Sequence, residues 1–222
     1  MGEMISMIAH QWRQPITAIG MMANTLILDA KFNDLDLKKI EENLEIINTQ
    51  VDYLSRTIDD FSNFFKADIK PQPIYVKTLL EETFDLLKPS LEKEMIELIL
   101  SVDPQLKVTL YKNEMQQVII NIINNARDAL RERKVNSPSI KINAFIAENK
   151  IIHLYITDNA GGIDSKIIDN IFDPYFSTKN VKNGTGLGLY MAKTIMRDRM
   201  RGDITVINTD IGATFSIALP ME

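Results

Sequence analysis

The N-terminal third of the chain carries apolar residues at intervals that alternate between four and three positions. Residues three and four apart lie on one face of an α-helix, so this spacing predicts two long helices, each with an apolar seam. A short polar turn over residues 31–36 separates them, and Asp36 is the predicted N-cap of the second helix. The seam positions are Ile8, Trp12, Pro15, Ile19, Met22 and Leu26 in the first helix, and Ile40, Leu44, Ile47, Val51, Leu54, Ile58, Phe61 and Phe65 in the second.

The two predicted helices make a thin hairpin, because each has a single apolar stripe. Such a hairpin buries little surface by itself, and a partner is expected. The economical arrangement is a symmetric homodimer in which two hairpins form a four-helix bundle.

The pattern changes after the segment Lys70-Pro71-Gln72-Pro73, which cannot continue a helix. We place a domain boundary there, with a first domain at residues 1–70 and a second at 71–222. Asn113, with Gln116 three residues later, resembles a capping box at the start of a helix. We predict helices at 78–91, 113–133 and 187–199, and strands at 96–102, 108–110, 140–147, 151–158, 203–208 and 213–219. This order predicts an α+β fold, in which the helical hairpin is followed by a two-layer α/β sandwich with a mostly antiparallel sheet.

Composition narrows the classes of function. Of 222 residues, 45% are hydrophobic and 25% charged, which is typical of a soluble globular protein. The formal net charge of -5 argues against a protein that coats nucleic acid. The absence of Cys excludes disulfides, thiolate nucleophiles and Cys-based metal sites, and two His make a multi-His metal site unexpected. No apolar run is long enough to cross a bilayer and no signal peptide is visible, so we expect a cytoplasmic location for this portion.

His10 is a candidate nucleophile on the first helix. In the heptad register it falls at position f, the position farthest from the predicted bundle core. A solvated surface residue is the ordinary interpretation of such a His. However, Pro15 in the same helix removes the backbone hydrogen bond to the carbonyl of Gln11, at a cost of about 3 kcal/mol. An exposed imidazole beside this irregularity is well suited to nucleophilic chemistry near neutral pH.

The run HQWRQP at 10–15 resembles the phosphoacceptor box of two-component sensor histidine kinases, H-[ED]-x-[RN]-x-P. The matching residues are His10, Arg13 and Pro15, and the resemblance implies that His10 is the phosphoacceptor. Two positions depart from the family pattern. Gln11 replaces the acid that is thought to act as a base on the imidazole, and an amide cannot take a proton at neutral pH. Gln14 stands where the family often has a Thr or Asn that orients water to dephosphorylate the partner.

Four segments of the second domain fit one binding site. They read NIINNARDAL at 121–130, DNAGGI at 158–163, FDPYFSTK at 172–179 and GTGLGL at 184–189. Asn121 and Asn125 are four apart and therefore share a helix face. Asp158 ends an apolar row of a strand, where a carboxylate can accept a hydrogen bond from an amino group, and His153 faces the other way and is expected to be structural. The glycine-rich run leads into a helix, whose N-terminus can hold phosphate.

In this order and spacing the segments resemble the N, G1, F and G2 boxes of the same kinase family, whose ATP-binding fold is shared with the GHKL (Bergerat) ATPases. GATFSI at 212–217 is similar to the last box. The resemblance implies that ATP and Mg²⁺ are cofactors, with Asn125 on Mg²⁺, Asn121 at the phosphate end and Asp158 on adenine. It also implies a mobile lid at 173–186. No role is assigned to Ala160, Asp128 or the run Met200-Arg201-Gly202. The cofactor-binding residues that the resemblance implies are Asn121, Asn125, Asp158, Gly162, Phe172, Lys179, Gly184, Thr185, Gly186, Leu187 and Gly188.

The function implied by the resemblance is ATP-dependent autophosphorylation of His10, followed by transfer to an Asp of a response-regulator receiver domain. It also implies a homodimer and a sensor region upstream, through which the full-length protein could be anchored to a membrane. The main rival is a GHKL ATPase of the mismatch-repair, gyrase or heat-shock type. Those enzymes carry a Glu four residues before the Mg²⁺-binding Asn to activate water, where this chain has Asn121. A second rival is a pseudokinase or a protein that mainly dephosphorylates its partner, and Gln11 leaves this open.

Overall fold

The structure is a computed structural model of the chain, and it describes residues 2–32, 36–65, 70–147, 150–179 and 185–221. The side chains of residues 2–11, 56 and 59–65 lie outside this description. Contacts between backbone positions divide the chain into two compact units. The first unit comprises residues 1–62 and 177–185, and the second comprises residues 63–176 and 186–222. The domain division at residues 70 and 71 stays a prediction.

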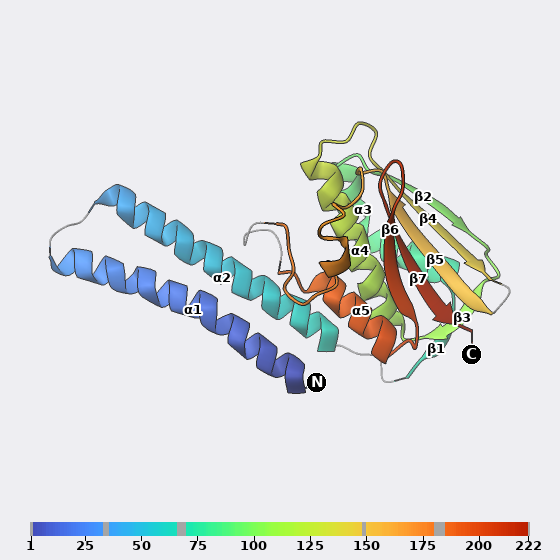
Figure 1. The fold of residues 1–222 in the computed structure, drawn as a ribbon, viewed down its shortest axis with the longest axis horizontal. Coiled ribbons are helices and arrows are strands. Elements are labelled where there is room, and N and C mark those ends of the chain that lie inside the picture. The colour runs from blue at the N-terminus through green and yellow to red at the C-terminus, as the bar shows by residue number, and fades with distance from the viewer. Residues whose placement is uncertain (1, 33–35, 66–69, 148–149, 180–184, 222) are drawn as a thin grey trace. The chain divides into compact units, whose positions relative to one another are not determined.

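The first unit contains the two predicted helices, α1 (Gly2–Lys31) and α2 (Leu37–Phe65) (Figure 1). Asp36 is the N-cap of α2, as predicted, because its Oδ1 accepts a hydrogen bond of 2.9 Å from the backbone N–H of Lys38. Pro15 lies inside α1 without ending the helix. The long-helix part of the fold prediction is therefore confirmed.

Part of the apolar seam of α2 is exposed within one chain. Leu44, Val51 and Ile58 on α2 are 47%, 48% and 48% exposed, which is high for residues of an apolar seam. The side chains of Phe61 and Phe65, the last two predicted seam positions, lie outside the described residues. Further half-exposed apolar residues on α1 are Ile16, Met21, Ile27 and Leu28.

The second unit is built on a five-stranded sheet with the strand order β2-β4-β5-β7-β6. Only β2 and β4 pair in parallel, and the other neighbours are antiparallel, so the predicted mostly antiparallel sheet is confirmed. A separate two-stranded antiparallel sheet joins β1 to β3. The strands are β1 (Gln72–Tyr75), β2 (Glu97–Val102), β3 (Lys107–Leu110), β4 (Ser139–Ile146), β5 (Ile151–Asp158), β6 (Asp203–Asn208) and β7 (Ala213–Pro220).

Three helices, α3 (Val76–Lys93), α4 (Lys112–Glu132) and α5 (Gly188–Asp198), cover one face of the five-stranded sheet (Figure 1). A short 3₁₀ helix, η1 (Ile168–Asn170), precedes α5. Every second side chain of β5 points into the core and is buried, because the side-chain period of a strand is two. The facing stripe of α4 contributes Ile119, Ile122 and Ile123, all fully buried. The two-layer α/β sandwich is therefore confirmed.

Two local features differ from the sequence prediction. A strand, β1, begins at Gln72 and pairs with β3, where no strand was predicted. The predicted capping box of Asn113 and Gln116 is wrong. Helix α4 starts at Lys112, with Tyr111 as its N-cap in an extended conformation and without a side-chain cap. Because the helix begins one residue early, Asn113 already lies within its first turn.

Candidate functional site

Asp158 is the buried carboxylate of the site. It ends β5 on the core side of the sheet and is 6% exposed. Its Oδ1 accepts hydrogen bonds from the backbone N–H groups of Ala160 at 2.8 Å and Ala213 at 3.2 Å. Burial raises the pKa of Asp158, while these two hydrogen bonds and the positive charge of Arg133 act in the opposite direction. Both of these bonds end on Oδ1, so Oδ2 is the oxygen on which a ligand could donate a hydrogen bond.

The turn between β6 and β7 reaches Asp158 because residue 212 is glycine. A Cβ at Gly212 would lie 1.9 Å from the backbone oxygen of Asp158 and 2.7 Å from its Oδ1. No other residue type fits this close approach. The sequence prediction included the GATFSI segment as a family box but gave Gly212 no role, since the proximity to Asp158 arises only from the pairing of distant strands.

The loop after Asp158 is bonded on several sides. Gly161 and Gly162 have φ values of +84° and +81°, which favour glycine. The N–H of Gly161 donates to the carbonyl of Ile211 at 2.8 Å. Ile163 and the side-chain amide of Asn208 exchange two hydrogen bonds, of 2.7 Å and 2.6 Å. The loop is thus shaped by protein contacts before any ligand binds.

Asn121 links the predicted N and G2 boxes. Its side-chain Nδ2 donates to the carbonyl oxygen of Gly188 at 3.0 Å, across 67 positions of sequence. Its Oδ1 accepts from the side chain of Gln117 at 3.4 Å. Asn125 lies one turn further along α4 and is half-buried. The structure therefore brings this face of α4 to the start of α5.

The residues before α5 shape the helix start mainly through their backbone. Leu187 is the N-cap of α5 and its side chain is buried, so only its backbone can face a ligand. Gly186 has a φ of +67°, and its carbonyl accepts from the N–H of Tyr175 at 3.0 Å. This bond closes the base of the predicted lid. Gly184 lies outside the described residues, and Thr185 is half-buried.

Phe172 anchors the predicted F box to the core. Its ring packs edge-on against Phe215 of β7, with centroids 6.4 Å apart, and the Nζ of Lys193 lies 4.7 Å above it. Lys179 belongs to the first unit, and its backbone N–H donates to Ser177 at 3.1 Å. The structure thus gives Phe172 a packing role.

The predicted phosphoacceptor segment is helical. His10 and Gln11 lie on α1, and their side chains are outside the described set. Arg13 and Gln14 are exposed, so both can meet a partner. The hydroxyl of Thr17 donates to the carbonyl of Arg13 at 2.7 Å.

The second unit fits a purine nucleotide at three of its features. Asp158 offers a free carboxylate oxygen at the end of an apolar strand, two glycines bring backbone close beside it, and α5 starts after a glycine-rich segment. A base with an amino group suits the first feature, and phosphate suits the exposed N–H groups at the start of a helix. Asn125 supplies the kind of amide oxygen that Mg²⁺ accepts as a ligand.

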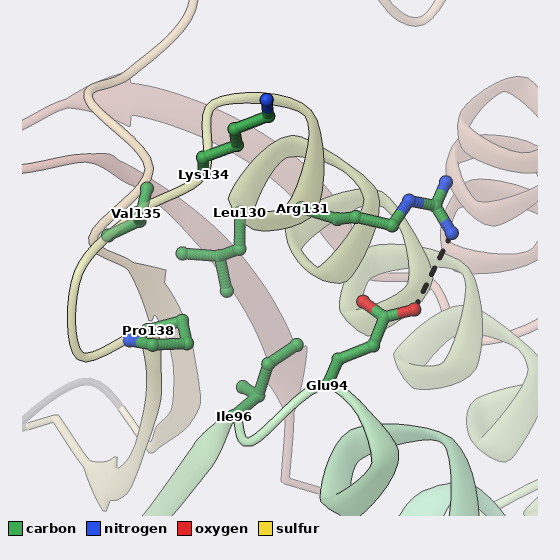
Figure 2. A pocket seen from close by; sticks show the side chains of 7 residues that line it. All are labelled: Glu94, Ile96, Leu130, Arg131, Lys134, Val135 and Pro138. Atoms are coloured by element: carbon green, nitrogen blue, oxygen red, sulfur yellow. Dashed lines mark hydrogen bonds and ion pairs between the residues drawn. The ribbon is translucent and has the colours of Figure 1, made fainter.

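A small pocket lies apart from these residues, between the C-terminal end of α4 and the start of β2. It measures about 210 Å³ and has an apolar floor that includes Ile96 and Leu130. Figure 2 shows Arg131 reaching Glu94 beside it, at 3.5 Å. None of the predicted nucleotide-binding residues lines the pocket, so it is not part of the predicted site.

None of the helices in the described part of the chain combines the length and apolar character needed to cross a membrane.

Comparison with known proteins identifies two families along the chain. Residues 1–69 match the His Kinase A (phospho-acceptor) domain. Residues 111–222 match the family described as histidine kinase-, DNA gyrase B-, and HSP90-like ATPase, which binds ATP.

Individual relatives agree with these families. The chain is 31% identical to the two-component sensor PprA of Pseudomonas aeruginosa, over 100% of this chain and 24% of PprA. It is 30% identical to the signal transduction histidine-protein kinase AtoS of Escherichia coli, over 100% of this chain and 35% of AtoS. The chain thus spans about a quarter of the length of PprA and about a third of the length of AtoS. The fold resembles histidine kinase ThkA, solved in complex with response regulator TrrA, with a TM-score of 0.68, 24% identity and coverage of 100% of this chain and 62% of ThkA. The chain belongs to the histidine kinase-, DNA gyrase B- and HSP90-like ATPase family and, with the phospho-acceptor domain in front, is the catalytic core of a sensor histidine kinase.

Proposed function

We propose that this chain transfers the γ-phosphoryl group of ATP to His10 and then to an aspartate of a response-regulator receiver domain. The observation that carries the proposal is the side-chain amide of Asn121, which is bonded to Gly188 at the start of α5, where we propose that the phosphates lie. An amide there cannot remove a proton from water. ATP held against this face keeps its γ-phosphate for a nucleophile other than water, and His10 on the phospho-acceptor domain supplies one.

The base end of the nucleotide would be held by Asp158. Its Oδ2 accepts a hydrogen bond from the adenine amino group, while Oδ1 stays bonded to the backbone of Ala160 and Ala213. A carboxylate in a buried site distinguishes an amino group from a carbonyl oxygen, because the carbonyl would leave two acceptors facing one another. The positive φ values of Gly161 and Gly162 let the loop backbone come close to a flat ring.

The phosphate end would lie at the start of α5. The N–H groups at a helix N-terminus carry partial positive charge and point outward, which suits phosphate oxygens. Asn125 is the proposed ligand of Mg²⁺, and the ion would neutralise phosphate charge when bound. Gly162, Phe172, Lys179, Gly184, Thr185, Gly186, Leu187 and Gly188 complete the proposed nucleotide set.

In the transfer step, a ring nitrogen of neutral His10 attacks the γ-phosphorus in line with the bond to the β-phosphate oxygen. The new N–P bond forms as that P–O bond breaks, and ADP leaves with the electron pair. Gln11 can orient the ring by a hydrogen bond but cannot take its proton, so the proton passes to solvent.

The proposed partners are a second copy of this chain and a receiver domain. The half-exposed seam residues Leu44, Val51 and Ile58 support a dimer through the hairpin, since a second hairpin would bury them. The complex of ThkA with TrrA supports a receiver domain as the acceptor. We also propose a sensor region elsewhere in the full-length protein. The support is that this chain spans only 24% of the length of PprA and 35% of the length of AtoS.

A second activity, dephosphorylation of the partner, is supported by Gln14. Its amide is exposed on α1, one helical turn after His10, and can hold a water by hydrogen bonds.

Incubation with γ-labelled ATP and Mg²⁺ tests the kinase proposal. We expect an acid-labile label, because a phosphorus–nitrogen bond hydrolyses in acid, and we expect its loss in His10→Ala. Tight nucleotide binding without any label in the wild-type chain would contradict the kinase proposal and favour a binding module.

A further inference from the structure

We propose that Arg133 and Asn208 are positioning residues that hold the loop at 160–163, so that Asp158 presents one free carboxylate oxygen to a purine carrying an amino group. The proposal rests on the nucleotide site described above. It adds two residues that lie outside the predicted family boxes, one at the end of α4 and one at the end of β6.

Arg133 holds the loop from the side of α4. It is the C-cap residue of this helix, and its Nη1 donates to the carbonyl oxygen of Ala160. A Cβ at Gly161 would lie 2.9 Å from the same Nη1. The guanidinium group therefore lies directly against the loop backbone, in space that only a glycine at position 161 leaves open.

Asn208 holds the loop from the side of β6. Its Oδ1 accepts from the N–H of Ile163 at 2.7 Å, and its Nδ2 donates to the carbonyl of Ile163 at 2.6 Å. The side-chain amide thus pairs with Ile163 as a strand backbone would. A Cβ at Gly162 would lie 2.8 Å from Oδ1 of Asn208. Each of the two glycines therefore faces one of the two proposed positioning residues.

The Arg133 contact acts on Asp158 through Ala160, and the Asn208 contact holds the far end of the same loop at Ile163. The N–H of Ala160 donates to Oδ1 of Asp158, while its carbonyl accepts from Arg133. The N–H and the carbonyl of Ala160 belong to adjacent peptide planes that share its Cα, so a bond at the carbonyl restricts how far the N–H can turn away from Asp158. The carboxylate is then held by Oδ1 and keeps Oδ2 for the ligand. A loop held in this way need not be ordered when a nucleotide binds, which improves affinity.

The charge of Arg133 supports the same role. Burial raises the pKa of Asp158, and the positive charge of Arg133 is one of the influences that lower it. The arginine thereby favours the ionised carboxylate, which accepts hydrogen bonds but does not donate them.

Calorimetric titration with ADP and with GDP tests the proposal on the full chain. We expect Arg133→Met and Asn208→Ala each to weaken ADP binding by about fivefold or more, and to reduce the preference for ADP over GDP. A purely structural role would lower the melting temperature without changing this preference. Arg133→Lys keeps a donor and the charge, and we expect it to bind ADP more tightly than Arg133→Met does.

Two matched variants serve as controls. Lys134→Met removes the same charge one residue later, and Asn143→Ala removes an exposed amide from β4. We expect both to bind ADP within about twofold of the wild type.

The reference variant is Asp158→Ala, which is expected to weaken ADP binding strongly. If it does so while Arg133→Met and Asn208→Ala keep the wild-type affinity and preference, the positioning role is wrong and the nucleotide site stands. If Asp158→Ala binds ADP as the wild type does, both proposals fall. Should Arg133→Met not fold by circular dichroism, folded Asn208→Ala decides: wild-type affinity and preference in this variant overturn the proposal.

Discussion

The side-chain amide of Asn121 donates a hydrogen bond of 3.0 Å to the carbonyl oxygen of Gly188, the first residue of α5. This bond ties the middle of α4 to the helix whose N-terminus is proposed to hold phosphate. The bond also uses the only amino group of the Asn121 side chain. It therefore fixes the position of this side chain between α4 and the start of α5.

We predict that Asn121→Asp destabilises the second unit and weakens ATP binding. The variant has nearly the same shape but places a carboxylate oxygen against the carbonyl of Gly188, where a donor stood. The hydrogen bond is lost and two acceptors then face each other, so we expect the free energy of unfolding to fall by about 1–3 kcal/mol. Urea denaturation followed by circular dichroism measures the loss. Asn124→Asp, at the neighbouring half-buried position, is the control and is expected to lose less stability. Equal stabilities of Asn121→Asp and the wild type would show that the bond contributes nothing.

We predict that Gly212→Ala strongly impairs nucleotide binding. Its Cβ would meet the backbone oxygen of Asp158 at 1.9 Å, so the β6–β7 turn must move away from the carboxylate. We expect ADP affinity to fall by at least tenfold, measured by calorimetry, because Oδ1 of Asp158 then loses its hydrogen bond from Ala213. Gly20→Ala is the control, since a Cβ at Gly20 has nothing within 4 Å and should stabilise α1 by about 0.5–1 kcal/mol. An ADP affinity of Gly212→Ala within threefold of the wild type would contradict the close approach.

The elements with a regular pattern could be predicted from the sequence, and those made by distant pairing could not. The alternation of β5 sets its inward face and places Asp158 at its buried end. By contrast, β1 is four residues long, contains Pro73 and is stabilised by pairing with β3, which lies some thirty positions later. The hydrophobic pattern of one sequence does not show that β1 pairs with β3, because the two strands are far apart along the chain.

The same distinction applies to the site. The boxes revealed Asn121 and Asp158, because their types and spacing are unusual. Arg133 and Asn208 are an ordinary surface arginine and a strand-ending asparagine when seen in sequence. Their bonds to the loop become visible only when the C-terminal end of α4, the end of β5 and the end of β6 come together.

We predict that Asp158 makes stability fall as pH rises through the acid range. Burial raises the pKa of this carboxyl in the folded state above its value in the unfolded chain. Below the unfolded value both states carry the proton and stability is constant. Between the two pKa values the folded state holds more protons than the unfolded state, so each rise in pH lowers stability, and above the folded pKa it is constant again.

Asp158→Asn isolates this effect, because an amide does not titrate in this range. We expect its stability relative to the wild type to increase from about pH 4 upward and then to level off. Urea unfolding at several pH values measures the difference. A difference that decreases as pH rises would mean that the pKa of Asp158 is lowered on folding, contrary to the prediction.

We predict that Val51→Asp dissociates the proposed dimer. Val51 is a seam position of α2 and is 48% exposed in one chain, so a charge there costs little in the monomer but would be buried between two hairpins. Ser55→Asp, at an exposed position of the same helix outside the seam, is the matched control and should leave the dimer intact. Light scattering coupled to size exclusion gives the mass of each variant. If Val51→Asp has the same dimeric mass as the wild type, the seam is not the interface. If wild type and both variants are monomers, the hairpin does not associate by itself, and its exposed seam must be covered in another way.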